Sequence, residues 1–137
     1  MISKFTLFFM FILLNSPLAF AADKVSPAQV DGANTVSTAE AKALFDKGVI
    51  FVDVRSDKDF DAGRIPDALH LNSKTKLSEA SLSEETGKAD DVVMYCNGAS
   101  CMRSSNASAM AVSWGFSNVY YYRDGYPAWK LAGNPVE

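Results

Sequence analysis

Apolar residues occur along this chain in short runs separated by polar stretches. Residues 49–52 and 92–95 are continuous apolar runs, which are typical of strands buried on both faces of a sheet. Residues 68–71 and 118–122 lie between turn residues and predict two further strands. Helix-like or polar stretches separate these strands, so the pattern favours parallel strands joined by crossovers.

Two stretches have the spacing of an amphipathic helix. Ser37 and Glu40 form a capping-box pattern ahead of the first helix, and Gly48 ends it. The second helix opens at Arg103. Its predicted apolar face consists of Ala107, Met110, Ala111 and Trp114.

The remaining segments predict smaller elements. Residues 56–63 suggest a single helical turn anchored by Phe60, and residues 74–88 suggest a weak helix and a loop. Residues 124–127 read as a turn, and residues 128–132 as a last helical turn. Together these elements predict an α/β fold with a central, mainly parallel sheet flanked by helices on both faces.

The N-terminal residues have the features of a secretory signal peptide. Lys4 supplies a basic start, and the apolar run over residues 5–14 is short for a membrane span. Ala19 and Ala21 fit an A-x-A cleavage site, which predicts cleavage after Ala21. An uncleaved anchor is the alternative.

This interpretation divides the chain into three parts. We predict a signal peptide over residues 1–21, a polar leader over residues 22–35 and a folded domain over residues 36–137. We expect the leader to be mobile and to end in a short edge segment. The mature protein is then expected in the periplasm, soluble and without membrane contact.

Composition narrows the choice of partners. The 137 residues suit one domain, and loss of Lys4 with the signal would change the net charge from −3 to −4. The sequence contains no basic stripe of the kind that would suggest nucleic-acid binding. The chain has two cysteines and one histidine, too few for a structural zinc site, so we expect no metal and no cofactor. Export would place both cysteines in oxidising conditions.

The stretch after residues 92–95 contains the main candidate chemistry. Cys96 ends this predicted strand, and a polar loop separates it from the helix that opens at Arg103. Ligands bind at the carboxyl ends of strands in such sheets, and a helix N-terminus attracts anions and favours a thiolate. Cys96 is therefore the candidate nucleophile, with a buried packing cysteine as the alternative. The candidate substrate-binding residues are Asn97, Gly98, Ala99, Ser100 and Arg103.

Three other polar residues are interpreted as structural. Asp53 and Arg55 follow the predicted strand at residues 49–52. We expect them to form a buried hydrogen-bonded pair that supports nearby loops. His70 is the chain's one histidine and lies far from Cys96 in sequence. The absence of an obvious histidine base argues against a Cys–His hydrolase.

Three ordered blocks resemble the single-domain rhodaneses. The first consists of residues 52–55 followed by Phe60, Gly63, Ile65, Pro66 and Ala68. The second consists of Cys96, Arg103, Ser104 and Ala107, and the third of residues 115–119, 124–129 and 132–136. The resemblance extends over residues 36–136. It implies a rhodanese α/β fold and sulfurtransferase chemistry, in which Cys96 takes a sulfane sulfur from a donor such as thiosulfate and passes it to cyanide or a thiol.

The chain departs from the family pattern at the active-site loop. Six residues separate Cys96 from Arg103, where the family usually has four. Arg64 replaces a common histidine, and Asp124 replaces the first glycine of a pair. Cys101 is additional, and the chain resembles exported rhodanese-like proteins with a second loop cysteine. Cys101 is therefore a candidate redox partner of Cys96, or else a packing cysteine.

These features support more than one class of function. The leading hypothesis is an exported sulfurtransferase whose partners are a small anionic sulfur donor and a thiol acceptor or a thiol-reducing protein. The second is a thiol–disulfide or redox-sensing protein that uses Cys96 and Cys101. A non-catalytic binding module is the third. A phosphatase is ranked last because the sequence shows no evident general acid.

Overall fold

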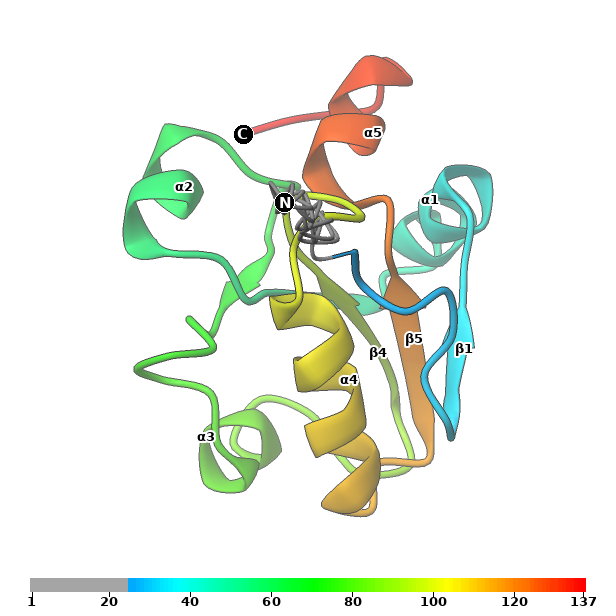
Figure 1. The fold of residues 1–137 in the computed structure, drawn as a ribbon, viewed down its shortest axis with the longest axis vertical. Coiled ribbons are helices and arrows are strands. Elements are labelled where there is room, and N and C mark those ends of the chain that lie inside the picture. Colours follow the sequence, from blue (N-terminus) through cyan, green and yellow to red (C-terminus); the bar gives the residue numbers. More distant parts are fainter. Residues whose placement is uncertain (1–24) are drawn as a thin grey trace, which may run out of the picture.

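The structure, a computed structural model, describes residues 25–137; the predicted signal peptide lies outside these residues. The strands are β1 (Ala33–Thr35), β2 (Ile50–Asp53), β3 (Leu69–His70), β4 (Asp91–Tyr95) and β5 (Asn118–Tyr122). The helices are α1 (Thr38–Asp46), α2 (Asp57–Ala62), α3 (Glu79–Ser83), α4 (Arg103–Ser113) and α5 (Gly125–Leu131) (Figure 1). Within the described residues, no helix is long and apolar enough to span a bilayer.

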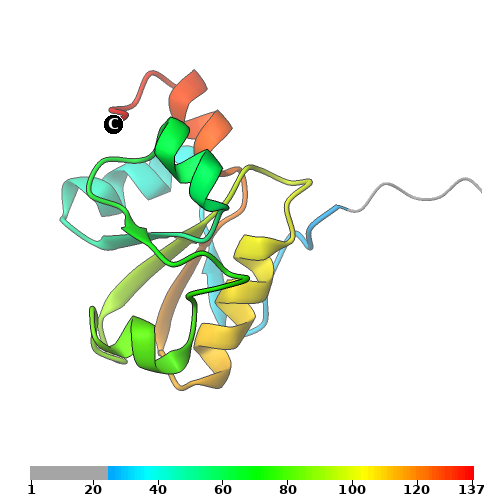
Figure 2. The same cartoon turned by 90° about the vertical axis from the view of Figure 1, so that its left-hand side faces the viewer.

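The five strands form one parallel sheet in the order β1-β5-β4-β2-β3. The central strand β4 pairs with β2 and β5, with Met94 opposite Val52 and Tyr121. Figures 1 and 2 show α3 and α4 on one side of the sheet and α1 and α5 on the other. This arrangement confirms the α/β fold and the parallel sheet expected from the sequence.

Alternation along β4 assigns each side chain to one face of the sheet. Val92, Met94 and Cys96 contribute to the core cluster that includes Ala107 and Ala111 of α4. Val93 and Tyr95 contribute to a second cluster, which includes Ala41 of α1 and Trp129 of α5. Neighbouring residues at the end of β4 therefore lie on opposite faces of the sheet: Cys96 faces α4, and Tyr95 faces α1 and α5.

Helix α1 begins as its sequence predicts. The Ser37 hydroxyl accepts from the backbone N–H of Glu40 at 3.2 Å, and the Glu40 carboxylate accepts from the backbone N–H of Ser37 at 2.7 Å. These reciprocal bonds satisfy N–H groups that a helix start leaves without intrahelical partners.

The buried face of α4 differs from the predicted one. Ala107 and Ala111 are buried as expected, but Met110 is 37% exposed. The serines Ser104, Ser105 and Ser108 are buried instead. Small side chains on this face let α4 approach the sheet closely, and the Ser108 hydroxyl is satisfied by the Ser104 carbonyl at 2.7 Å.

Two other segments also differ from expectation. The last helix, α5, begins at Gly125, so residues expected to form only a turn already belong to its first turn. Proline is tolerated there because Pro127 lies in the first turn of the helix, where a backbone N–H has no intrahelical acceptor. In the predicted mobile leader, Ser26 is 3% exposed and so packs on the domain. The expected edge segment at the end of the leader is β1, which pairs with β5 at the edge of the sheet.

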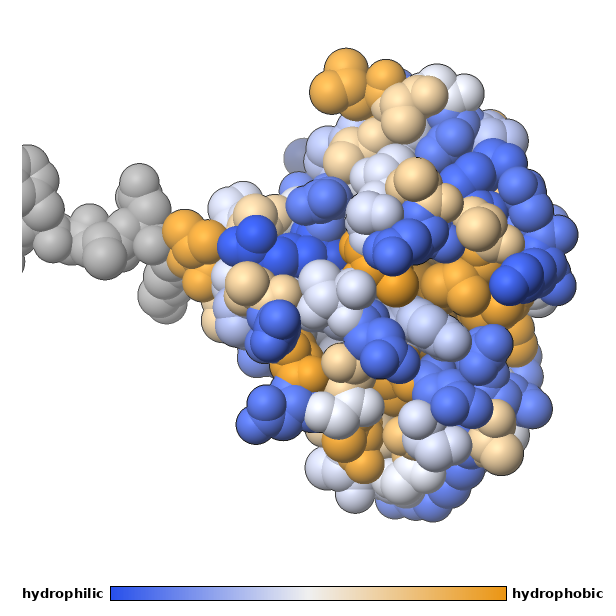
Figure 3. Space-filling view, turned by 90° about the vertical axis from the view of Figure 1, so that its right-hand side faces the viewer, coloured by the Kyte–Doolittle hydropathy of each residue, from blue (hydrophilic) through white to orange (hydrophobic). Residues whose placement is uncertain are grey.

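The face over α1 and β1 is mostly hydrophilic. Figure 3 shows small apolar patches there, separated by hydrophilic atoms, rather than one broad apolar area. The polar network and the cysteine pair described below lie instead at the carboxyl edge of the sheet, where the loops after β2 and β4 meet.

Candidate functional site

Cys96 follows the last residue of β4 and forms a disulfide with Cys101. Their Cα atoms lie 6.4 Å apart, within the range of about 4.4–6.8 Å usual for disulfides. Cys96 is 1% exposed, whereas Cys101 is half-buried. The structure therefore pairs two cysteines whose relation the sequence had left open. In this form neither sulfur is a free thiol, so the site must be reduced before Cys96 can act as a nucleophile.

The loop between the two cysteines presents a row of backbone donors. Within residues 25–137, the N–H groups of Asn97, Gly98, Ala99 and Ser100 have no hydrogen-bond acceptor. Gly98 has a φ of 108°, a conformation that an L side chain rarely adopts. Successive free N–H groups in such a loop form a concavity suited to an anion. These free donors make the loop a candidate anion-binding site beside Cys96.

A buried ion pair supports the loop from the face opposite Cys96. The Arg55 Nη2 lies 2.6 Å from Asp53 Oδ2, and both side chains are buried, as the sequence suggested. The Tyr95 hydroxyl donates to the same carboxylate at 2.6 Å and accepts from the Ile65 N–H at 3.2 Å. Arg55 also donates to the Gly63 carbonyl at 2.7 Å. Every member of this network therefore has a partner, which is what makes a buried ion pair tolerable.

The network alters the acid–base properties of its members in consistent directions. Burial, assisted by the Asp53 charge and its hydrogen bond, raises the pKa of Tyr95, so this phenol stays protonated and remains a donor. Burial alone would lower the pKa of Arg55, but the hydrogen bond and charge of Asp53 outweigh it, and the net shift is upward. These groups keep one charge state at neutral pH, as a supporting framework requires.

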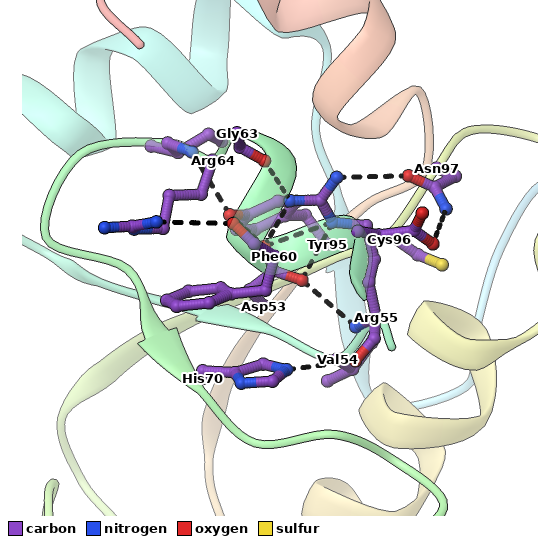
Figure 4. Close-up of polar contacts among 12 residues, drawn as sticks. Asp53, Val54, Arg55, Phe60, Gly63, Arg64, His70, Tyr95, Cys96 and Asn97 are labelled. Atoms are coloured by element: carbon purple, nitrogen blue, oxygen red, sulfur yellow. Dashed lines mark hydrogen bonds and ion pairs between the residues drawn. The ribbon is translucent and has the colours of Figure 1, made fainter. Parts of the chain in front are cut away.

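Asn97 connects this framework to the loop (Figure 4). Its side-chain oxygen accepts from Arg55 Nη1 at 3.3 Å, and its side-chain nitrogen donates to Asp59 Oδ2 of α2 at 3.0 Å. The hydrogen bond from Asn97 is the main reason that the pKa of Asp59 lies below its ordinary value. These two hydrogen bonds therefore fix Asn97, the first residue of the loop after Cys96. Both polar atoms of its side chain bind protein partners.

The start of α4 lies on the Cys96 face. Arg103 Nη1 donates to the Val54 carbonyl and to Asn72 Oδ1, both at 3.3 Å, so its side chain extends toward the ends of β2 and β3. Ser104 follows it on the buried face of α4, and its hydroxyl is the buried side-chain polar atom that lacks a partner among residues 25–137. This turn thus combines a cation, an unused hydroxyl donor and the free N–H groups of a helix start.

The first residues of α5 pack against the start of the loop, at Cys96 and Gly98. The Tyr126 N–H donates to the Cys96 carbonyl at 2.9 Å, and the Tyr126 ring lies 4.6 Å from the Arg55 guanidinium. Gly125 has a φ of 65°, and a Cβ there would lie 2.8 Å from the Gly98 nitrogen. Only glycine fits this approach. The third block of the resemblance, which includes residues 124–129, therefore contributes to the candidate site.

His70 lies outside the cysteine environment. Its ring stacks on Phe60 with centroids 4.2 Å apart, and its Nε2 lies 3.1 Å from the Arg55 carbonyl oxygen. Figure 4 shows His70 and Phe60 together, away from the Cys96 sulfur. The structure thus gives His70 a packing role and places no histidine beside Cys96.

The candidate site also includes contacts that the sequence analysis did not predict. Ser26, Asp59, Asn72, Tyr95 and Gly125 all contact the loop, Arg103 or the supporting network. Gly125 stands in a motif already singled out, so a signal for it existed. Ser26 stands alone in a polar stretch, and nothing in its surroundings distinguishes it.

The chain is similar to known proteins over most of its length. The Rhodanese-like domain model matches residues 37–132. The chain is 33% identical over 91 residues to the thiosulfate sulfurtransferase GlpE of Pseudomonas syringae pv. syringae, covering 66% of this chain and 81% of that protein. It is 38% identical over 88 residues to a sulfurtransferase of Allochromatium vinosum, covering 64% and 78% of the two chains.

Solved structures agree with this assignment. The human single-domain sulfurtransferase TSTD1 superposes with a TM-score of 0.59 at 28% identity, covering 72% of this chain and 96% of that one. In longer relatives the match is one part of the protein: the chain spans 38% of the HTH-type transcriptional regulator Rv0324 of Mycobacterium tuberculosis, at 38% identity. By its sequence blocks, its sheet and the extent of these matches, the chain belongs to the Rhodanese-like domain family.

Proposed function

We propose that this protein is a sulfurtransferase that carries a sulfane sulfur on Cys96. The observation that supports this most directly is the position of Cys96. It directly follows β4 and begins a loop in which four backbone N–H groups have no acceptor within residues 25–137. The named sulfurtransferases among its relatives support the same reaction class. The proposed donor is thiosulfate or a similar anion, and the proposed acceptor is a thiol or cyanide.

The reaction divides into two displacements at sulfur. The Cys96 thiolate attacks the outer sulfur of the donor, the donor S–S bond breaks, and sulfite leaves with the bonding electron pair. An acceptor thiolate then attacks the outer sulfur of the Cys96 persulfide, and the Cys96 thiolate leaves. Loop N–H groups and Arg103 hold the anionic end of the donor. Each such charge-assisted bond contributes roughly 1.5–3 kcal/mol.

The disulfide requires an activation step before this cycle. A reductant thiolate attacks Cys101, since Cys101 is half-buried and Cys96 is nearly fully buried. The Cys96–Cys101 bond breaks, Cys96 leaves as thiolate, and Cys101 enters a mixed disulfide. A second reductant thiolate attacks the reductant's sulfur in that mixed disulfide, which releases Cys101 as thiolate and the oxidised reductant. A thiol-reducing protein is the proposed physiological reductant.

The Cys96–Cys101 bond also favours a second candidate function, a thiol–disulfide redox protein. In that case the pair would exchange electrons with partners, and no persulfide would form. The proposed export to the periplasm suits either function because an oxidising compartment favours the closed disulfide. The pair would protect Cys96 from irreversible oxidation in both cases.

Activity measurements separate the two candidates. We expect the wild type to transfer sulfur from thiosulfate only after reduction with dithiothreitol and removal of the reductant. Cys96→Ser should abolish transfer, because a hydroxyl cannot store a sulfane sulfur. Cys101→Ser should be active without prior reduction, and after mild oxidation it should lose activity irreversibly while the wild type recovers.

Arg103 gives a finer test of the donor. Arg103→Ala should lower kcat/KM for thiosulfate roughly 10- to 150-fold and affect an uncharged persulfide donor less.

Retention of transfer by Cys96→Ser would exclude Cys96 as the nucleophile. No transfer by the reduced wild type, together with reversible disulfide exchange, would favour the redox protein.

A further inference from the structure

The N-terminal strap, residues 26–32, reaches the loop between the two cysteines. The Ser26 backbone N–H and the Ser26 hydroxyl both donate to the Ala99 carbonyl, at 2.7 and 2.8 Å. Ser26 is 3% exposed, so these bonds are shielded from water. Figures 1 and 2 show this segment beside the loop that precedes α4. The Ala99 carbonyl is thus held by a residue 73 positions away.

The strap is itself held by the sheet. Arg123, directly after β5, donates from Nη2 to the Ser26 carbonyl at 2.9 Å and from Nε to the Ser26 hydroxyl at 3.3 Å. The Tyr121 hydroxyl donates to the Pro27 carbonyl at 3.0 Å. Ser26 therefore forms a bridge between a rigid strand end and the loop.

These contacts fix one peptide plane of the loop. Because a trans peptide is planar, the Ser100 N–H points opposite to the Ala99 carbonyl and so away from the strap. Without the strap, this peptide could rotate and exchange the positions of its donor and acceptor. Ser26 thereby sets the direction of one of the four free N–H groups of the loop.

We propose that Ser26 is a positioning residue of the site and that it stabilises the Cys96–Cys101 disulfide through Ala99. Ala99 lies within the ring that the disulfide closes, residues 96–101. Disulfide and strap each restrict this loop, so either one reduces the ordering cost of the other. By reciprocity, reduction of the cysteines loosens the strap. Ser26 lies outside residues 37–132, which the family model matches.

This inference deepens the proposed function, but its test requires no sulfur transfer. The oxidised chain is equilibrated with reduced and oxidised glutathione, free thiols are alkylated, and the dithiol and disulfide forms are counted by mass. Two reduced glutathiones convert one protein disulfide to the dithiol and yield one oxidised glutathione. Ser26→Ala removes the hydroxyl donor while the backbone donor remains. We expect roughly a 2- to 12-fold shift toward the dithiol, the effect of one neutral hydrogen bond.

Matched variants exclude a general effect on the fold. Ser26→Thr keeps a hydroxyl and should recover much of the wild-type equilibrium. Ser113→Ala removes an exposed serine bond at the far end of α4 and should leave the equilibrium unchanged. Arg123→Met, which removes the support of Ser26, should shift it in the same direction as Ser26→Ala.

Amide hydrogen exchange of the wild type provides a second reading. The Ser26 N–H should exchange faster in the reduced protein than in the oxidised protein, whereas amides of β4 should change little. An unchanged glutathione equilibrium in Ser26→Ala, or equal exchange of Ser26 in both forms, would overturn the proposal. If the equilibrium shifts but thiosulfate adds no sulfur, the strap stands and the sulfurtransferase proposal fails.

Discussion

The loop between Cys96 and Cys101 is held at two points of different physical character. At Asn97, it joins a buried, charged network of Asp53, Arg55 and Tyr95. At Ala99, it is held by neutral hydrogen bonds from Ser26. All residues of the first attachment lie within the matched residues 37–132, whereas Ser26 of the second lies before them.

This difference separates support from adjustment. Removing one member of a buried ion pair leaves a charge without compensation, so the first attachment cannot change without loss of stability. A neutral hydrogen bond contributes about 0.5–1.5 kcal/mol, which allows the second attachment to open and close. We infer that the Asp53–Arg55 side keeps the end of β4 in place while the Ser26 side responds to the state of the cysteines.

The largest expected effect comes from breaking the charged attachment. Arg55→Met leaves the buried Asp53 carboxylate without its partner and should lower the free energy of unfolding by about 3–5 kcal/mol. Urea unfolding of the oxidised proteins measures this loss. Arg123→Met is the matched control, since it removes an arginine that donates to the neutral Ser26 carbonyl rather than to a buried carboxylate, and it should cost about 1.5–3 kcal/mol. Equal losses for the two variants would remove the distinction between the attachments.

A second, smaller effect is expected at Gly125, which lies against the first half of the loop, at Cys96 and Gly98. An added methyl group would meet the Gly98 nitrogen at 2.8 Å in a backbone with a φ of 65°. Gly125→Ala should therefore cost more than the roughly 1–2 kcal/mol of a left-handed non-glycine residue alone. Gly133→Ala isolates that backbone cost, because φ is 77° and nothing lies within 4 Å. If both variants lose the same stability, the contact of Gly125 with the loop is unimportant.

The smallest expected effect is in the titration of Asp59. Its pKa lies below the ordinary value mainly because Asn97 donates to it, so NMR of the carboxyl group should show a midpoint below about 3.9. A depressed folded pKa adds stability that is present above the unfolded pKa and is lost as the pH falls through the folded pKa. The Asp59 contribution should therefore disappear only in that acidic window.

Asn97→Ala removes the main cause and should raise the Asp59 midpoint toward its ordinary value. Asn106→Ala, on an exposed position of α4, should leave the midpoint unchanged. A midpoint that stays low in Asn97→Ala would mean that Asn97 is not joined to α2 in solution.

The sequence was most informative where local chemistry determines structure. The capping box at Ser37, the apolar runs of β2 and β4 and the cysteine at a strand end all follow from nearest neighbours and periodicity. The buried face of α4 was misjudged at Met110, because helical spacing is compatible with several faces and the sheet selected one lined with serines.

Long-range contacts could not be predicted in the same way. Ser26 and Ala99 are 73 positions apart, and a serine in a polar stretch has no local property that indicates burial. The contact of Asp59 with Asn97 depends on how α2 packs over the end of β4, which the family pattern does not specify. Such partners are determined by tertiary packing, and only the folded structure reveals them.

The central claim, that reduced Cys96 carries the sulfur, is tested most directly by intact mass. The purified protein is reduced, freed of reductant, incubated with thiosulfate and compared with Cys96→Ser and Cys101→Ser treated identically. The account predicts that wild type and Cys101→Ser gain the mass of one sulfur atom, that peptide mapping places it on Cys96, and that Cys96→Ser gains none. No gain in the reduced wild type, or a gain that persists in Cys96→Ser, would contradict it.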